Sequence, residues 1–108
     1  ETIFCERVSG KFALRRGFVL KKNSRVLIVE DVITTGKSSL ECVKLIKKSK
    51  ASLVGFASII DRSTKKTLKI KKKIISHLKI DVPTFKVNEL PNNLKLIPIT
   101  VPGSRFIK

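Results

Sequence analysis

The chain contains no methionine and no tryptophan, and it has no long uninterrupted apolar run. No stretch approaches the roughly 18 consecutive apolar residues of a membrane-spanning helix. Glu1–Gly10 carry charges and no apolar core, so the sequence predicts neither a membrane span nor a secretory signal peptide. Because translation begins with methionine, we expect the 108 residues to be part of a longer protein.

Cysteine and histidine are scarce. Cys5 and Cys42 are far apart in the sequence and lack the short spacing of metal ligands. We therefore expect two reduced thiols in a cytoplasmic protein, with neither a zinc site nor a disulfide framework. The lone histidine, His77, falls in an apolar run, and we predict a structural role for it.

Acidic residues are also few, because 8 Asp and Glu stand against 24 Lys and Arg, giving a net charge of +16. This excess favours anionic partners, namely phosphorylated metabolites, nucleic acid or acidic membranes, without choosing among them. Lysine runs such as Lys71–Lys73 are also typical of a solvated surface. The six phenylalanines are not interleaved with the basic residues, which argues against nucleic-acid binding.

Hydrophobic residues make up 42% of the chain, and many are Ile, Leu and Val. This composition favours a folded α/β unit over disorder, and the length allows one small domain. At the N-terminus, Thr2–Phe4 and Phe12–Leu20 are predicted to form two short strands, joined by a turn over Val8–Lys11. Lys21–Ser24 form a polar turn before the next element.

The middle of the chain predicts a strand, a helix and a second strand. The run Arg25–Val29 is typical of a central parallel strand buried on both faces. After a turn at Thr34–Gly36, a helix capped by Lys37 or Ser38 is expected to run to about Ser49. Leu53–Ile60 reads as a second buried strand. This order indicates a right-handed βαβ unit with a parallel sheet.

The signals weaken beyond Asp61. Ile74–Ile80 is compatible with a strand or with part of a helix, and we prefer a strand because Asp81–Pro83 end it. A loop is predicted over Asn88–Asn93. Pro102–Arg105 is predicted to form a turn.

The most informative stretch joins two acids to a small polar loop. Glu30 and Asp31 follow the first buried strand, and Thr34–Ser39 lead into the helix. In an open parallel sheet, ligands bind just beyond the carboxyl ends of the strands. Unpaired backbone N–H groups at a helix N-terminus favour an anion such as phosphate, and Gly36 allows a turn that a side chain would obstruct. Further hydroxyl donors come from Thr34, Thr35, Ser38 and Ser39.

The two acids indicate what the rest of the ligand is. A carboxylate accepts two hydrogen bonds and can hold a vicinal diol such as the 2′- and 3′-hydroxyls of ribose.

Two other interpretations of this stretch are weaker. Gly36–Ser38 resembles the end of a nucleotide P-loop, but that motif requires glycine where Asp31 stands. If Thr35 and Ser38 only capped a helix, two acids at the end of a buried strand would be left without a partner.

The segment Val26–Ser39, VLIVEDVITTGKSS, resembles the phosphoribosyl-pyrophosphate (PRPP) motif of type I phosphoribosyltransferases. The resemblance implies that Glu30 and Asp31 hold the ribose hydroxyls and that Thr34–Ser39 wrap the 5′-phosphate. It also implies a Rossmann-like α/β fold, of which residues 1–108 are the C-terminal part of one domain. The PRPP-binding residues would be Glu30, Asp31, Val32, Ile33, Thr34, Thr35, Gly36, Lys37, Ser38 and Ser39.

Three stretches resemble the orotate branch of this family. The first is Ile33–Gly36 with Glu30 as the leading acid, and the second is Ile60–Ser63. By this resemblance Arg62, together with Thr34, would bind orotate, since a guanidinium offers a planar fork to its carboxylate. The third group, similar to shorter bacterial members, comprises Phe4–Arg7, Leu14–Phe18 and Pro102–Arg105.

The resemblance also implies a homodimer. In the family, a mobile loop before the motif strand carries basic residues that reach the pyrophosphate of the neighbouring subunit. Glu6–Lys11 lies in that region, so Arg7, Lys11 and the motif acid Asp31 are the candidate catalytic residues. The sequence departs from the pattern because Leu90–Leu96 lacks a cysteine pair found in many shorter members. The family is also considerably longer at the N-terminus.

The implied reaction is the transfer of a 5-phosphoribosyl group from PRPP to orotate, giving orotidine 5′-phosphate and pyrophosphate. The implied cofactor is Mg²⁺, bound through the substrate and water without a direct protein ligand. We expect the complete protein to be an active cytoplasmic dimer without a membrane partner, and these 108 residues to be inactive by themselves. The alternatives are a purine or uracil phosphoribosyltransferase, or a regulatory PRPP-binding module that binds nucleic acid.

Overall fold

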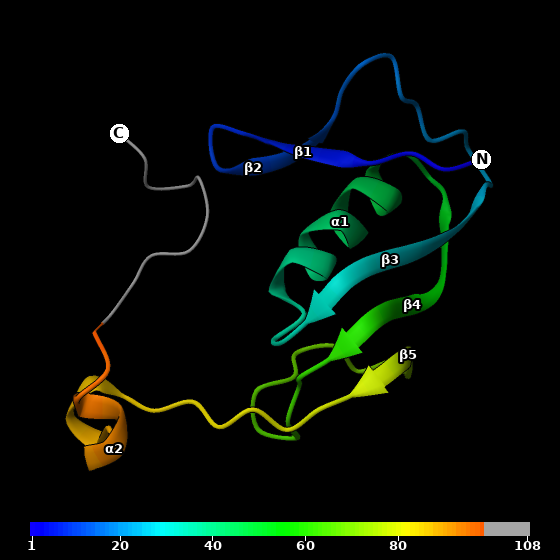
Figure 1. Cartoon of the computed structure of the whole chain (residues 1–108). Helices are drawn as coiled ribbons and strands as arrows, with labels where there is room; N and C mark the ends of the chain where they lie inside the picture. Colours follow the sequence, from blue (N-terminus) through cyan, green and yellow to red (C-terminus); the bar gives the residue numbers. More distant parts are fainter. Residues whose placement is uncertain (99–108) are drawn as a thin grey trace.

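A three-stranded parallel sheet organises the chain in the computed structural model, which describes residues 1–98 (Figure 1). Its strands are β3 (Arg25–Ile33), β4 (Ser52–Asp61) and β5 (Ile74–Lys79), in the order β3-β4-β5. Helix α1 (Lys37–Lys48) connects β3 to β4 and packs on one face of the sheet. The predicted strand–helix–strand unit with a parallel sheet is therefore confirmed.

The core lies between α1 and the sheet face that it covers. Side chains of α1 three and four residues apart form an apolar stripe toward the sheet, and Lys44, Lys47 and Lys48 remain exposed as predicted. Each apolar side chain buried in this way stabilises the fold by about 1.5–3 kcal/mol. The buried hydrophobic residues are Ile28, Ile33, Ile46, Phe56 and Ile70.

The pairing of β3 with β4 shifts by one residue near its start. Val26 pairs with Leu53 and Leu27 pairs with Gly55, so that Val54 is an additional residue in β4. Beyond this irregularity the register is continuous, and Glu30 lies beside Ser58.

The other face of the sheet is exposed, which corrects the prediction of strands buried on both faces. Val29 of β3, Ile59 of β4 and Ile75 of β5 are 67%, 59% and 70% exposed. Among residues 1–98, β3 pairs only with β4 and is therefore an edge strand, whereas we predicted a central one. An apolar run predicts burial, but a strand is covered on both faces only where other elements pack on both.

Strand β3 is also longer than predicted. It continues through both acids to Ile33, because its pairing with β4 extends as far as Ile33 and Asp61. Glu30 and Asp31 therefore belong to the strand itself and do not follow it. Their side chains point to opposite sides, as successive residues of a strand do.

An antiparallel hairpin precedes the sheet, as predicted, but with other strand bounds. Its strands are β1 (Cys5–Val8) and β2 (Lys11–Leu14). Ser9 and Gly10 have φ values of 47° and 79°, and such a two-residue turn fixes the register of the flanking residues. The two strands therefore flank the turn directly, and they include charged residues such as Arg7 and Lys11 that lie outside the apolar runs from which the strands were predicted.

Two further predictions about helices were wrong. The N-cap of α1 is Gly36, not Lys37 or Ser38, because the positive φ of the turn places the glycine at the helix start. Asn88–Asn93 is not all loop, since a 3₁₀ turn η1 (Val87–Glu89) and a short helix α2 (Asn92–Lys95) fall there. Pro91 starts α2 with a φ of −57°, the value that its ring imposes.

Strand β5 confirms the predicted strand near Ile74–Ile80, although it ends at Lys79. His77, predicted to be a structural residue, is exposed on this strand, and Lys71–Lys73 are exposed as expected. The predicted turn at Pro102–Arg105 lies outside the described residues. No helix within residues 1–98 combines the length and the apolar character needed to cross a membrane.

Candidate functional site

A tight turn joins the end of β3 to α1. Gly36 has a φ of +72°, a value that residues with a Cβ rarely adopt. A Cβ at this position would also lie 2.6 Å from Cδ1 of Ile70, which is buried. Glycine is therefore required here on two independent grounds, backbone conformation and space.

The segment after β4 holds this turn in place. The backbone N–H of Lys69 donates to the carbonyl oxygen of Thr35 (2.9 Å), and the N–H of Arg62 donates to the carbonyl oxygen of Ile33 (2.8 Å). Between these two contacts, the hydroxyls of Thr64 and Thr67 lie 3.0 Å apart in a local turn. The residues following β4 thus contact the β3–α1 turn at two points.

The two acids of β3 have different surroundings. Glu30 is half-buried and accepts a hydrogen bond from the Ser39 hydroxyl (Oε1–Oγ 2.8 Å), while Ser39 itself is only 1% exposed. Asp31 is exposed, and its Oδ1 accepts the N–H of Val32 at 2.7 Å. One carboxylate is therefore fixed against α1, and the other faces solvent.

The start of α1 presents donors that an anion can use. The first backbone N–H groups of a helix have no partner within the helix, and the helix dipole favours negative charge there. One of them, that of Lys37, donates to Oγ1 of Thr35 at 3.3 Å. The side chains of Thr34 and Lys37 are exposed beside this end, and Ser38 is half-buried. The N–H groups at the start of α1, which can bind an anion, thus lie close in sequence to the carboxylates of Glu30 and Asp31, which can accept hydrogen bonds from hydroxyl groups.

Comparison with known proteins assigns this arrangement to a family. The family described as "Phosphoribosyl transferase domain" matches residues 6–91, which include β3, the turn and α1. The chain belongs to this family. Its parallel sheet and α1 form a partial phosphoribosyltransferase α/β fold.

Several relatives of this phosphoribosyltransferase chain are named orotate phosphoribosyltransferase. The protein from Parvibaculum lavamentivorans is 46% identical over 97% of this chain, and that from Erythrobacter litoralis is 42% identical over 97%. The chain spans about half the length of these relatives, 54% in both cases. A solved adenine phosphoribosyltransferase from Leishmania donovani is 29% identical with a TM-score of 0.49, over 63% of this chain and 33% of its own.

The predicted base-binding residue, Arg62, lies next to the turn of this phosphoribosyltransferase chain. Its backbone contact with Ile33 places it at the carboxyl edge of the sheet, and its buried Nε has no hydrogen-bond partner among residues 1–98. The preceding Asp61 is 5% exposed. Burial raises the pKa of Asp61, but hydrogen bonds from Ser63 and the charge of Lys79 lower it below its usual value. Asp61 is therefore held as a carboxylate.

The two basic residues of the hairpin are not brought to the turn. The Arg7 guanidinium lies 3.1 Å from a carboxylate oxygen of Glu41 on α1, donates to the Gly10 carbonyl and stacks on Phe12. Lys11 is exposed at the hairpin turn.

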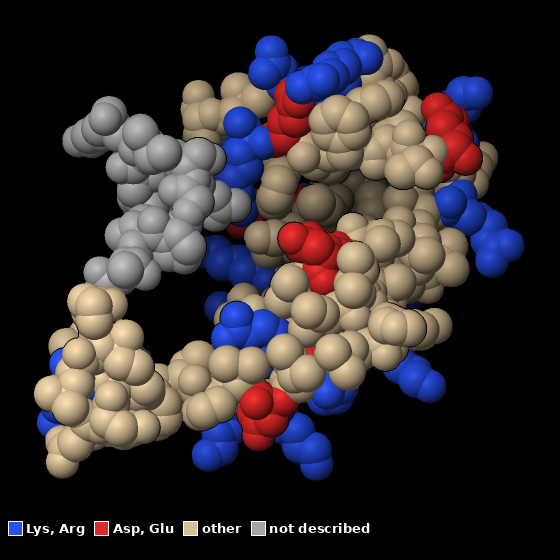
Figure 2. Space-filling model, viewed as in Figure 1, with Lys and Arg blue, Asp and Glu red and all other residues tan. Residues whose placement is uncertain are grey.

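A hollow of about 880 Å³ separates the hairpin from β3, and Glu30 is among the residues lining it. Figure 2 shows this face, with both basic and acidic side chains around the margin of the hollow.

Sequence reasoning missed Ile70 and Lys69 as supports of the turn. Neither has a local signal, since their contacts with Gly36 and Thr35 come from the path of the chain after β4. A glycine in a polar loop indicates a special backbone conformation, but it does not reveal which residue occupies the space beside it.

The structure also brings Cys5 and Cys42 together, although they are far apart in sequence. Both are free and half-buried, and both line the hollow between the hairpin and β3. Burial is the main cause that raises the pKa of Cys42 from 9.0 to about 12. The Cys5 thiol and the carboxylates of Glu30 and Glu41 add to the shift.

We expect alkylation of Cys42 to be strongly suppressed in the folded chain. The thiolate is the reactive form, and each unit of pKa lowers its fraction about tenfold at a pH well below the pKa. Iodoacetamide at pH 8 should therefore modify Cys42 at least about 100-fold more slowly in the folded chain than in urea, as followed by peptide mass spectrometry. Comparable rates in the two conditions would contradict the buried position of this thiol.

Proposed function

We propose that this chain is the C-terminal part of an orotate phosphoribosyltransferase, which converts orotate and PRPP into orotidine 5′-phosphate and pyrophosphate. The observation that carries the proposal is the 46% identity to a protein of that name over 97% of this chain. The match to the phosphoribosyl transferase domain family supports the same reaction class.

In this proposal the β3–α1 region binds PRPP. Glu30 and Asp31 accept hydrogen bonds from the ribose hydroxyls, and Asp31 stabilises positive charge that develops on the ribose. The backbone from Thr34 to Ser39 surrounds the 5′-phosphate, with the Lys37 ammonium adding positive charge. The buried Ser39 hydroxyl, which donates to Glu30, acts by orienting that carboxylate. Catalysis then rests on positioning and electrostatic stabilisation, without a covalent enzyme intermediate.

Orotate would lie next to Arg62 and Thr34. Support comes from the hydrogen bond between the Arg62 N–H and Ile33, since it holds Arg62 beside the last residue of β3. The buried Nε of Arg62 lacks a partner among the described residues, and a buried donor of this kind favours an acceptor. A carboxylate can accept two parallel N–H groups from one guanidinium.

The chain's donor set suits an Mg²⁺ ion that is held mainly by the substrate. Within residues 1–98 there is no cluster of three or more side chains of the types that bind metals. Mg²⁺ keeps several waters when it binds phosphate oxygens, and the exposed carboxylate of Asp31 beside the turn would accept a hydrogen bond from such a water without binding the ion directly. The ion would neutralise charge on the pyrophosphate.

We further propose that the complete protein is a cytoplasmic homodimer and that the 108 residues do not turn over alone. Arg7 and Lys11 would act at the pyrophosphate of the partner subunit. For Arg7 this requires release from Glu41, its ion-pair partner in the isolated chain.

We expect this chain to bind PRPP at the β3–α1 turn, and Glu30→Gln to weaken the binding about 10-fold or more. Glutamine keeps an oxygen for the Ser39 hydroxyl but removes the charge, and a hydrogen bond to a charged group contributes about 1.5–3 kcal/mol. The measurement is a ¹H–¹⁵N NMR titration with PRPP and Mg²⁺, in which the amides of Glu30–Ser39 should shift.

The matched control is Glu89→Gln, which removes the same charge at an exposed residue paired with Lys86. It should leave the PRPP affinity within about twofold, since salt bridges exposed to solvent contribute little. A folded chain whose spectrum does not respond to PRPP would overturn the proposal. Equal weakening by both variants would show a general charge effect and not a ribose contact.

A further inference from the structure

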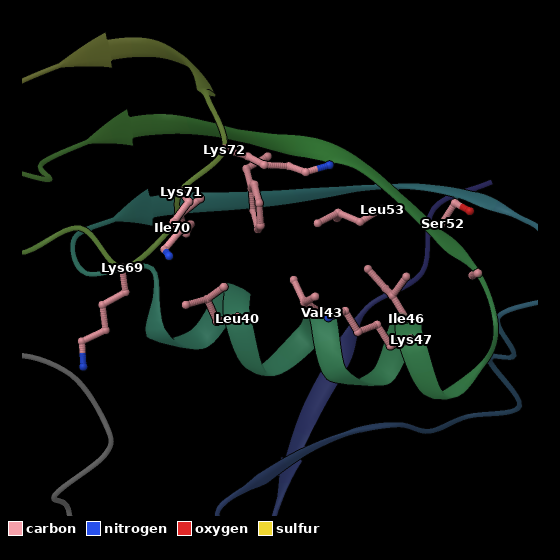
Figure 3. A pocket seen from close by; sticks show the side chains of 12 residues that line it. Leu40, Val43, Ile46, Lys47, Ser52, Leu53, Lys69, Ile70, Lys71 and Lys72 are labelled. Atoms are coloured by element: carbon pink, nitrogen blue, oxygen red, sulfur yellow. The ribbon is translucent and has the colours of Figure 1, made fainter.

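The connection between β4 and β5 leaves one position beside α1 empty. Parallel strands are usually connected through an α-helix that packs on the sheet. Here the connection, Arg62–Lys73, contains the Thr64–Thr67 turn and no helix. A groove of about 680 Å³ lies instead between α1, the start of β4 and Ile70–Lys72 (Figure 3).

The groove combines an apolar floor with a basic margin. The half-buried side chains of Val43 on α1 and Leu53 on β4 line it, together with Ile46 and Phe56, which belong to the buried core. Figure 3 shows the side chains of Val43, Ile46 and Leu53 directed into the space between the helix and the strand. An apolar surface of this kind between a helix and a sheet normally packs against a further element.

Lysines surround this floor on both sides. Lys47 lies on the α1 margin, and Lys71 and Lys72 lie on the opposite margin. All three are exposed, and no acidic residue lines the groove. In the view of Figure 3, Lys72 extends alongside β4 toward Leu53. An occupant must therefore be apolar on one side and negatively charged at its edges.

We propose that this groove binds an amphipathic helix with acidic flanks from a partner protein. A helix fits because the space is the one that a crossover helix would occupy, and an amphipathic helix binds such a groove through its apolar face. A second copy of this chain is disfavoured as the occupant, since it offers only 8 acidic residues against 24 Lys and Arg to pair with the lysines of the margin. The chain's own α2 contains no acid and ends in Lys95. The inference is independent of the proposed transferase activity.

The test uses the 108-residue chain and a fluorescent synthetic helix of about 18 residues. Leucine occupies positions i, i+3, i+4 and i+7, and glutamate occupies the flanking positions. We expect saturable binding by fluorescence anisotropy in 150 mM salt. A permuted peptide of the same composition but without an apolar face should bind at least about 10-fold more weakly. Amide shifts should centre on Val43 and Leu53.

Charge reversal at the margin of the groove distinguishes binding at this site from nonspecific attraction of an acidic peptide to a basic protein. Lys71→Glu with Lys72→Glu should weaken binding about 10-fold or more, because two attractive contacts become repulsive. The control, Lys65→Glu with Lys66→Glu, makes the same change at exposed residues of the same connection that do not line the groove. It should change the affinity less than about threefold. Equal losses in the two variants, equal binding of both peptides, or no saturable binding would overturn the proposal.

Discussion

Replacing Arg62 with alanine in the complete protein is expected to lower kcat/KM for orotate about 100-fold. A charge-assisted hydrogen bond contributes about 1.5–3 kcal/mol, and removal of the guanidinium would leave the orotate carboxylate without its partner. About 2.7 kcal/mol corresponds to 100-fold at 25 °C. The measurement is steady-state kinetics with orotate and, separately, with uracil, which has the same ring without the carboxylate.

The comparison of the two substrates determines what Arg62 does. A contact with the carboxylate predicts a loss confined to orotate, whereas the low activity on uracil should change less than about threefold. Arg62→Lys should be intermediate, since it keeps the charge but not the planar fork. If both substrates lose activity equally, Arg62 positions the turn through Ile33 and does not select the base. Efficient use of a purine by the unmodified protein would contradict the proposed function itself.

The second large effect is expected at Gly36. Gly36→Ala should lower the free energy of unfolding by about 2–4 kcal/mol, measured from urea denaturation of the 108-residue chain. The backbone strain of a positive φ accounts for about 1 kcal/mol or more, and insertion of a methyl group against a packed side chain for about 1–3 kcal/mol. The expected lowering follows from the φ of +72° and the 2.6 Å approach to Ile70.

A double-mutant cycle separates these two causes. Ile70→Ala alone should cost about 2–5 kcal/mol, because a buried side chain is truncated. In the double variant the steric conflict is absent while the backbone strain remains, so the combined loss should be about 1–2 kcal/mol smaller than the sum of the single losses. Strict additivity would show that Ile70 does not limit the space beside Gly36.

The contiguous part of the candidate site could be predicted from the sequence, because its parts follow one another along the chain. A β-branched run, two acids and a polar loop before an amphipathic stripe each have a local physical meaning. Arg62 is further along the chain, but its location also follows from a general rule. The carboxyl ends of parallel strands lie at one edge of a sheet, so residues that end β4 must lie near those that end β3.

Features that depend on the path of the chain could not be predicted. The approach of Ile70 to Gly36 requires the fold of the segment after β4. The contact between Cys5 and Cys42 requires the hairpin to lie against α1, and neither residue has a local signal for it. The bare side of the sheet was missed because an apolar run such as Arg25–Val29 shows what could be buried, not what is available to cover it.

The additional residue in β4 has a consequence for the whole βαβ unit. Side chains of a strand alternate between its two faces, so the count of residues before a given position determines which face it occupies. If the pairing that begins at Val26 and Leu53 continued without the register shift, Gly55 would lie beside Ile28 on the helix-covered face, and Phe56 would lie beside Val29 on the exposed face. Val54 is 48% exposed and contributes little packing of its own. The register shift that accommodates Val54 therefore sets which side chains of β4 face α1, and it aligns Ser58 with Glu30.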